Sequence, residues 1–253
     1  MLTYLKAENI KIRHTAIPRL ALFAPLATIL LSFFLACDFF MVDNYNWWYS
    51  MILPLYITII SGMLMQKDGK MGNRAVISLP IDLKKIWIAK IMIGVELLFI
   101  SCGVIFMGSV LFPVVRHVIG GTVEYGIPVT NAFLATIVLV ITFAWQIPFC
   151  MVLNEKLGMF VTLIINTGLN VTAGILAATE TFWWVFPHSY GARLMIPILN
   201  ILPNGLIAED GSETFSPMLL SWNVLIPGIL ISIILFLGLT WISARAYSNR
   251  EAC

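Results

Sequence analysis

Long apolar runs separated by shorter polar intervals dominate the pattern of this sequence. An α-helix rises ~1.5 Å per residue, so about 20 apolar residues are enough to cross the hydrocarbon core of a bilayer. The pattern therefore predicts an all-α membrane protein with six transmembrane helices in one bundle. We expect the spans at about residues 17–37, 47–65, 87–112, 131–153, 157–178 and 221–243.

Composition agrees with this class of protein. Of the 253 residues, 60% are hydrophobic and 11% are charged, whereas soluble domains carry about 25% charged residues. Six spans leave little length for a soluble domain, so the whole chain, 1–253, is predicted to form a single transmembrane domain. Neither the cysteines nor the histidines have the spacing of a ligand set, and we predict no metal site.

Charged residues are distributed unevenly between the two sides of the predicted bundle. The interval 66–86 is rich in Lys and Arg, and positively charged loops between spans stay in the cytoplasm. With both termini on that side as well, every Lys and Arg except Arg116 and Arg193 is cytoplasmic. Residues 1–16 are then expected to form an amphipathic helix on the anionic inner leaflet, and residues 38–46 a short outer loop.

Two of the apolar spans contain polar residues. Glu96 lies near the inner edge of the third span, where it is expected either to pair with a base on the cytoplasmic side or to take part in proton coupling. Thr162, Asn166 and Asn170 recur every four residues in the fifth span, so they share one helix face. Such a face meets protein or a transport pathway rather than lipid. Whether it faces a neighbouring chain or packs within its own chain stays open at this point.

The segment 179–220 is too interrupted by proline to span a bilayer and too apolar to be a solvated loop. We expect a re-entrant or interfacial hairpin on the outer side. Aromatic and polar side chains on this side either contact an amphiphilic substrate or anchor the protein at the interface. The candidates are Trp47, Trp48, Trp183, Trp184, Tyr190, Arg193 and Asn204. The expected partner of Arg193 is a lipid phosphate, a peptide carboxylate, a backbone carbonyl or Glu180.

Motifs of catalysis and nucleotide binding are absent from the sequence. It contains no HExxH, no GxSxG and no GxxxxGK[ST] phosphate loop. We therefore predict a transport protein rather than an enzyme. If transport is driven by ATP, another polypeptide must hydrolyse it.

The order of these features resembles the permease subunits of ABC-2-type transporters. The likeness rests on the spacing of Glu8, Lys11 and Arg13 before the first span, on the basic pattern over 72–90, and on six spans in a chain of this length. The outer segment is similar to that of lantibiotic-protection permeases of Gram-positive bacteria. Its pattern is Trp183-Trp184 leading to Pro187, His188, Tyr190 and Arg193, then Leu202-Pro203-Asn204-Gly205. Gln66 departs from the family pattern, in which many members have a Glu.

This resemblance implies a multi-pass protein of the bacterial plasma membrane that works with a dimer of a cytoplasmic ABC ATPase and with a second permease chain, identical or a sister. ATP and magnesium would bind to the ATPase, and this chain would hold no cofactor and no nucleic acid. The implied function is the expulsion of amphiphilic antimicrobial peptides, the lantibiotics, from the membrane. The alternatives are another cargo, such as a lipid, a drug or an ion, and a channel or carrier without an ATPase. The residues expected to contact the ATPase are Lys70, Gly72, Asn73, Arg74 and Ile77.

Overall fold

The computed structural model describes residues 1–69, 82–118 and 120–249. Within these ranges the chain is helical and forms no strand beyond one isolated bridge between Ile201 and Ile207. Among the described residues, six helical stretches are long and apolar enough to cross a membrane. They cover Ala16–Leu35, Phe40–Gln66, Leu83–Val118, Val129–Leu157, Met159–Leu176 and Trp222–Ser248. The predicted all-α class with six apolar spans is confirmed, and it indicates a multi-pass membrane protein.

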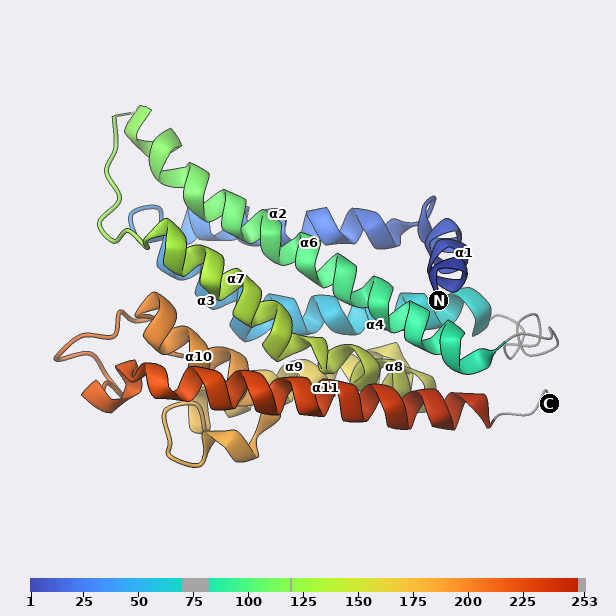
Figure 1. Cartoon of the computed structure of the whole chain (residues 1–253). Helices are drawn as coiled ribbons and strands as arrows, with labels where there is room; N and C mark the ends of the chain where they lie inside the picture. Colours follow the sequence, from blue (N-terminus) through green and yellow to red (C-terminus); the bar gives the residue numbers. More distant parts are fainter. Residues whose placement is uncertain (70–81, 119, 250–253) are drawn as a thin grey trace.

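The helices follow one another along the chain. Their bounds are α1 Leu2–Ile12, α2 Ala16–Leu35, α3 Phe40–Trp47, α4 Leu53–Gly69, α6 Leu83–Val118, α7 Val129–Ala144, α8 Gln146–Leu157, α9 Met159–Leu176, α10 Tyr190–Leu199 and α11 Leu225–Ser248. Figure 1 shows that α1, the end of α4, the start of α6 and the end of α11 lie at one end of the bundle, called here the terminal end. The links from α2 to α3 and from α10 to α11 lie at the opposite end.

Burial separates central spans from peripheral ones. In the stretches Phe40–Gln66 and Val129–Leu157, 67% and 72% of the most apolar window is buried, against 17% to 28% in the other four. The paired helices α3–α4 and α7–α8 therefore form the centre of the bundle. The peripheral helices α2, α6, α9 and α11 turn large apolar side chains outward, such as Phe23, Phe160 and Ile234, which suits a hydrocarbon environment.

The predicted outer loop at 38–46 is wrong, because α3 already begins at Phe40. Two of its polar residues, Asn44 and Tyr45, misled the prediction, since they are buried and make hydrogen bonds within the bundle instead of facing solvent. The Asn44 amide nitrogen donates to Ser109 Oγ at 2.9 Å, and the Tyr45 hydroxyl donates to the carbonyl of Ala132 at 3.2 Å. The second span is therefore longer at this end than the apolar run suggests.

The first helix, α1, lies across the terminal end of the bundle instead of along it (Figure 1). It buries Glu8 and Ile12, whereas Leu2 and Ile10 are more than two-thirds exposed, at 74% and 72%. The chain then turns into α2, where the Thr15 hydroxyl caps the helix by accepting from the Ile17 N–H at 3.2 Å. An interfacial position for α1 fits this exposed apolar surface.

The segment 179–220 enters the bundle through α10. All ten residues of this helix are buried, and it packs against α7. Gly191 lets the two helices approach closely, because a β-carbon at this position would overlap the ring of Phe143. The helix ends at Asn200, whose left-handed backbone with φ 56° turns the chain back. This packing explains why so apolar a segment contains no span of its own.

Candidate functional site

The second span is broken between α3 and α4 by a π-helical turn, Trp48–Ile52. Here the Leu53 N–H bonds to the carbonyl of Trp48, five residues back, so the Tyr49 carbonyl does not receive its ordinary helical donor. Proline has no N–H, so Pro54 cannot bond to the carbonyl of Ser50. Two neighbouring carbonyls in the interior therefore need donors from elsewhere in the protein.

Helix α9 supplies these donors from its polar face. The Asn170 amide nitrogen donates to the carbonyls of Tyr49 at 3.0 Å and Ser50 at 2.8 Å. One turn earlier, the Asn166 amide nitrogen donates to the carbonyl of Pro54 at 3.1 Å. The predicted polar stripe thus closes the break in the second span, and we call this contact between α9 and α4 the asparagine seam.

Further polar groups join the asparagine seam from α8 and from the segment before α10. The Asn166 amide nitrogen also donates to Gln146 Oε1 at 3.0 Å, and Gln146 Nε2 donates to Asn170 Oδ1 at 3.4 Å. His188 Nε2 lies 3.2 Å from Asn166 Oδ1, and its ring stands edge-on to that of Trp145. These contacts lie inside one chain. Within this chain, the polar stripe packs against the π-helical turn, α4 and α8.

A cavity of about 400 Å³ lies beside the asparagine seam, toward the end of the bundle opposite the terminal end. The walls come from the end of α3, from the π-helical turn, from α9, from α10 and from the residues that follow α10. Three of the predicted substrate candidates line it, namely Trp47, Asn170 and Asn204. The other lining residues are Asn46, Tyr49, Ser50, Met51, Val171, Gly174, Ile175, Ala192 and Pro203, and no charged side chain is among the residues that line this cavity.

The remaining outer candidates are not brought to this cavity. Trp48, Trp183 and Tyr190 are buried elsewhere, and the Tyr190 hydroxyl donates to the carbonyl of Trp184 at 2.7 Å. Arg193 is also buried and donates through Nη1 to the carbonyl of Leu219 at 2.8 Å. Of the four partners considered for Arg193, the structure thus shows a backbone carbonyl.

Trp184 is the exposed member of the outer candidates that do not line the cavity. Its side chain is 56% exposed, and Phe182 and Phe186 beside it are 46% and 47% exposed. Together they present an aromatic surface on the segment that precedes α10. Such a surface suits either an amphiphile or the bilayer interface.

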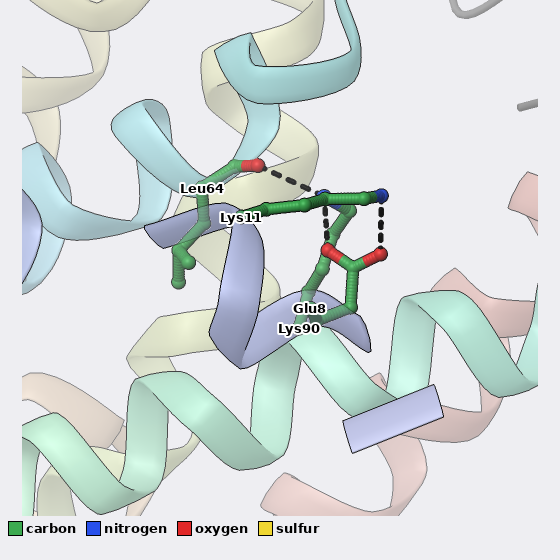
Figure 2. Close-up of polar contacts among 4 residues, drawn as sticks. All are labelled: Glu8, Lys11, Leu64 and Lys90. Atoms are coloured by element: carbon green, nitrogen blue, oxygen red, sulfur yellow. Dashed lines mark hydrogen bonds and ion pairs between the residues drawn. The ribbon is translucent and has the colours of Figure 1, made fainter. Parts of the chain in front are cut away.

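A buried ion cluster ties α1 to the spans at the terminal end, as Figure 2 shows. The Glu8 carboxylate lies 2.6 Å from Lys11 Nζ and 3.0 Å from Lys90 Nζ. Lys90 Nζ also donates to the carbonyl of Leu64 at 3.1 Å. The side chains of Glu8 and Lys90 are 5% and 2% exposed, so the charges are shielded from water. The cluster joins α1, the end of α4 and the start of α6.

The expected pairing of Glu96 with a base is not found among the described residues. Glu96 is exposed on the outward face of α6, whereas Lys90, the closest base along the helix, is turned to the buried face and paired with Glu8. The physical reason is helical geometry, because six residues separate the two positions and place them on different faces.

The predicted ATPase contacts Lys70, Gly72, Asn73, Arg74 and Ile77 lie outside the described residues. At the edge of that interval, the Asp82 N–H donates to the Tyr4 hydroxyl at 3.4 Å. The exposed Asp82 carboxylate lies 3.1 Å from Lys85 Nζ, and this hydrogen bond lowers the pKa of Asp82. Helix α1 therefore contacts the chain directly after the interval 70–81, and Lys90 connects α1 to the end of α4 before this interval.

Sequence reasoning missed the ion pair of Glu8 with Lys90 and the parts played by Gln146 and His188. A signal existed for Gln146, since it is an uncharged polar residue inside an apolar span. No pattern along the chain connects Glu8 with Lys90, because their contact depends on how α1 folds back.

No family model, no curated protein and no solved structure matches this chain.

Proposed function

We propose that this chain is the permease subunit of an ATP-binding cassette exporter that expels amphiphilic antimicrobial peptides, of the lantibiotic kind, from a bacterial plasma membrane. In this proposal the terminal end faces the cytoplasm, where a dimer of a separate ATPase docks. A second permease chain, identical or a sister, completes the transporter. The basis is the resemblance of the sequence motifs, together with an arrangement of the described residues that suits such coupling.

The observation that carries the proposal is the buried ion cluster of Glu8, Lys11 and Lys90. Helix α4 ends and helix α6 begins on either side of the charged interval 70–81. The cluster links both helices to α1 through Lys90 and the Leu64 carbonyl. A force applied to this interval would therefore act on α1, α4 and α6 together instead of bending one loop.

The break in the second span would serve as the hinge at which such a force moves the helices. A π-helical turn has weaker regular hydrogen bonding than an α-helix and is a frequent feature of functional sites. When the terminal end of α4 moves, the turn Trp48–Ile52 can absorb the movement, while the asparagine seam keeps α9 attached to α4. Hinges of this kind change the shape of a bundle without unfolding it.

On the outer side, the proposal assigns the first contact with cargo to the exposed aromatic surface around Trp184. An amphiphilic peptide in the outer leaflet presents apolar and polar groups at the same depth, which suits aromatic rings near the interface. Segment 179–220 would then re-enter the outer half of the bilayer through α10. No charge of this chain would need to cross the membrane in that step.

The experiment compares a strain lacking this chain with complemented strains on a panel of amphiphilic cationic peptides, a lipid-like drug and a monovalent ion load. Complementation should raise the tolerated concentration of at least one peptide about tenfold. A partner ATPase with its phosphate-loop lysine replaced by alanine should abolish this protection at equal abundance of the permease. Protection that persists without ATP hydrolysis would contradict the exporter. Protection confined to the drug or the ion would contradict the peptide cargo.

A further inference from the structure

The cavity beside the asparagine seam offers hydrogen-bonding groups but no charge. Its lining residues include Asn46, Asn170 and Asn204, together with Tyr49 and Ser50, whose carbonyls lack ordinary helical donors. Each of these carbonyls accepts one bond from Asn170. A carbonyl oxygen has two lone pairs, so each retains the capacity to accept another donor.

The rest of the wall is apolar and small. Gly174 of α9 and Ala192 of α10 are neighbours in this wall, and a β-carbon built on Gly174 would lie 3.8 Å from that of Ala192. At the rim, Met51 is 43% exposed and Ile175 is 62% exposed. A ligand can thus approach from the apolar exterior of the bundle, between the π-helical turn and α9.

The volume limits what can enter. Small-molecule sites occupy about 300–1,000 Å³, so about 400 Å³ accepts a fragment, not a whole peptide antibiotic. A bulky apolar side chain with its own backbone amides would fill the apolar wall and meet the carbonyls and side-chain amides. A phosphate or an ammonium group would be buried without a counter-charge, which is costly.

We propose that this cavity binds a short uncharged stretch of peptide, one bulky apolar side chain together with its backbone N–H and C=O groups. The inference rests on the proposed function in one respect, since a peptide in the outer leaflet is the source of such a stretch. A lipid acyl chain fits the apolar wall but brings no donor for the carbonyls of Tyr49 and Ser50. The polar groups of the cavity therefore favour peptide over lipid.

A peptide bound in the cavity would also affect the hydrogen bonds of the asparagine seam. Asn170 belongs to both, because it lines the cavity and donates to the two carbonyls of the broken span. A bound backbone N–H would share these carbonyls with Asn170. The contact between cargo and the π-helical turn would thus be direct.

The test uses the full chain in nanodiscs of phosphatidylglycerol and phosphatidylethanolamine, without its ATPase. The probe is a neutral photoreactive dipeptide, N-acetyl-benzoylphenylalanyl-leucinamide, and adducts are mapped by mass spectrometry. We expect adducts at Met51 and Ile175. The same dipeptide with a free, charged amino terminus should give at least fivefold fewer adducts, because the cavity offers no counter-charge.

Two variants on the same helix provide the matched comparison. Gly174→Leu fills the cavity and should lower the adduct yield at least tenfold, whereas Gly168→Leu, at an exposed glycine with open space around it, should leave it within twofold. If Gly174→Leu gives too little folded protein, Ile175→Trp at the exposed rim should produce the same loss.

Unchanged adduct yield in Gly174→Leu and Ile175→Trp would overturn the proposal. So would a phospholipid with a benzophenone on its acyl chain that labels Met51 and Ile175 with the same dependence on Gly174, while the dipeptide does not. Because the measurement omits the ATPase, its failure alongside intact ATP-dependent protection would reject the cavity and leave the exporter. Correct labelling, combined with protection that persists without ATP hydrolysis, would support the cavity and reject the exporter.

Discussion

Replacement of Glu8 by glutamine should destabilise the protein strongly, although the change is nearly isosteric. Glu8 accepts from two ammonium groups, Lys11 at 2.6 Å and Lys90 at 3.0 Å. Without the carboxylate, the charge of Lys90 stays buried with a neutral amide beside it. Removal of one partner of a buried ion pair costs about 3–5 kcal/mol. At about 2–4 °C per kcal/mol for chains of this size, the unfolding midpoint should fall by about 6–20 °C.

Two further variants at this cluster separate the contribution of charge pairing to stability from that of side-chain packing. Lys90→Met should cost less than Glu8→Gln, because Glu8 keeps Lys11 as a partner and an apolar side chain carries no desolvation penalty at that site. The double variant Glu8→Leu with Lys90→Met should recover most of the loss, since no charge is left at the buried position 90 and Lys11, at 35% exposed, keeps access to water.

The control is the pair of Arg116 and Asp38 at the opposite end, whose side chains are 26% and 55% exposed. Arg116→Met should cost less than about 1 kcal/mol, as exposed ion pairs do. Thermal unfolding in nanodiscs, followed by near-UV circular dichroism, measures all four variants. A shift for Glu8→Gln no larger than that for Arg116→Met would refute the stabilising role of the buried cluster.

Three further predictions concern the seam, the packing of α10 and the outer aromatic surface. Asn170→Leu removes the donors to two carbonyls, and each unsatisfied carbonyl costs about 1–3 kcal/mol. The free energy of unfolding, measured with a chemical denaturant, should therefore fall by about 2–6 kcal/mol. An unchanged denaturation midpoint would contradict the stabilising role of the asparagine seam. Gly191→Ala should cost about 1–3 kcal/mol by overpacking, whereas Gly103→Ala, with no atom within 4 Å of the new β-carbon, should cost nothing in the same assay. Trp184→Ala should reduce protection against one peptide more than against another while the abundance of the permease stays constant. Tyr190→Ala, at a buried position, should instead lower the abundance of the permease. Equal losses of protection against all peptides in both variants would reject cargo contact at Trp184.

The spans themselves could be predicted from the sequence because membrane helices need long apolar runs, and such runs are visible without any tertiary information. Their ends were harder. The polarity around Asn44 and Tyr45 predicts a loop, but the Asn44 amide nitrogen donates to α6 and the Tyr45 hydroxyl donates to α7. Polar residues indicate a solvent-exposed loop only where they have no hydrogen-bond partner inside the protein. Whether such a partner is present depends on how the helices pack.

The polar stripe of α9 was predictable as a helix face, but its partner was not. The spacing of Asn166 and Asn170 follows from helical periodicity. The carbonyls to which they donate become available only because of the π-helical turn and Pro54, and a π-helical turn has no reliable signature in a single sequence. The contact of Glu8 with Lys90 could not be predicted from the sequence for a similar reason, since it depends on the position of α1 across the bundle.

The central claim, that this chain is the membrane partner of an ATPase, is tested most directly by purification of the tagged chain from its native membranes in mild detergent. The account predicts that an ATPase with a GxxxxGK[ST] phosphate loop is recovered in near-stoichiometric amount, and that Lys70→Glu with Arg74→Glu removes this ATPase while the folded permease is retained. A folded permease recovered without any ATPase, from cells that it still protects, would contradict the account.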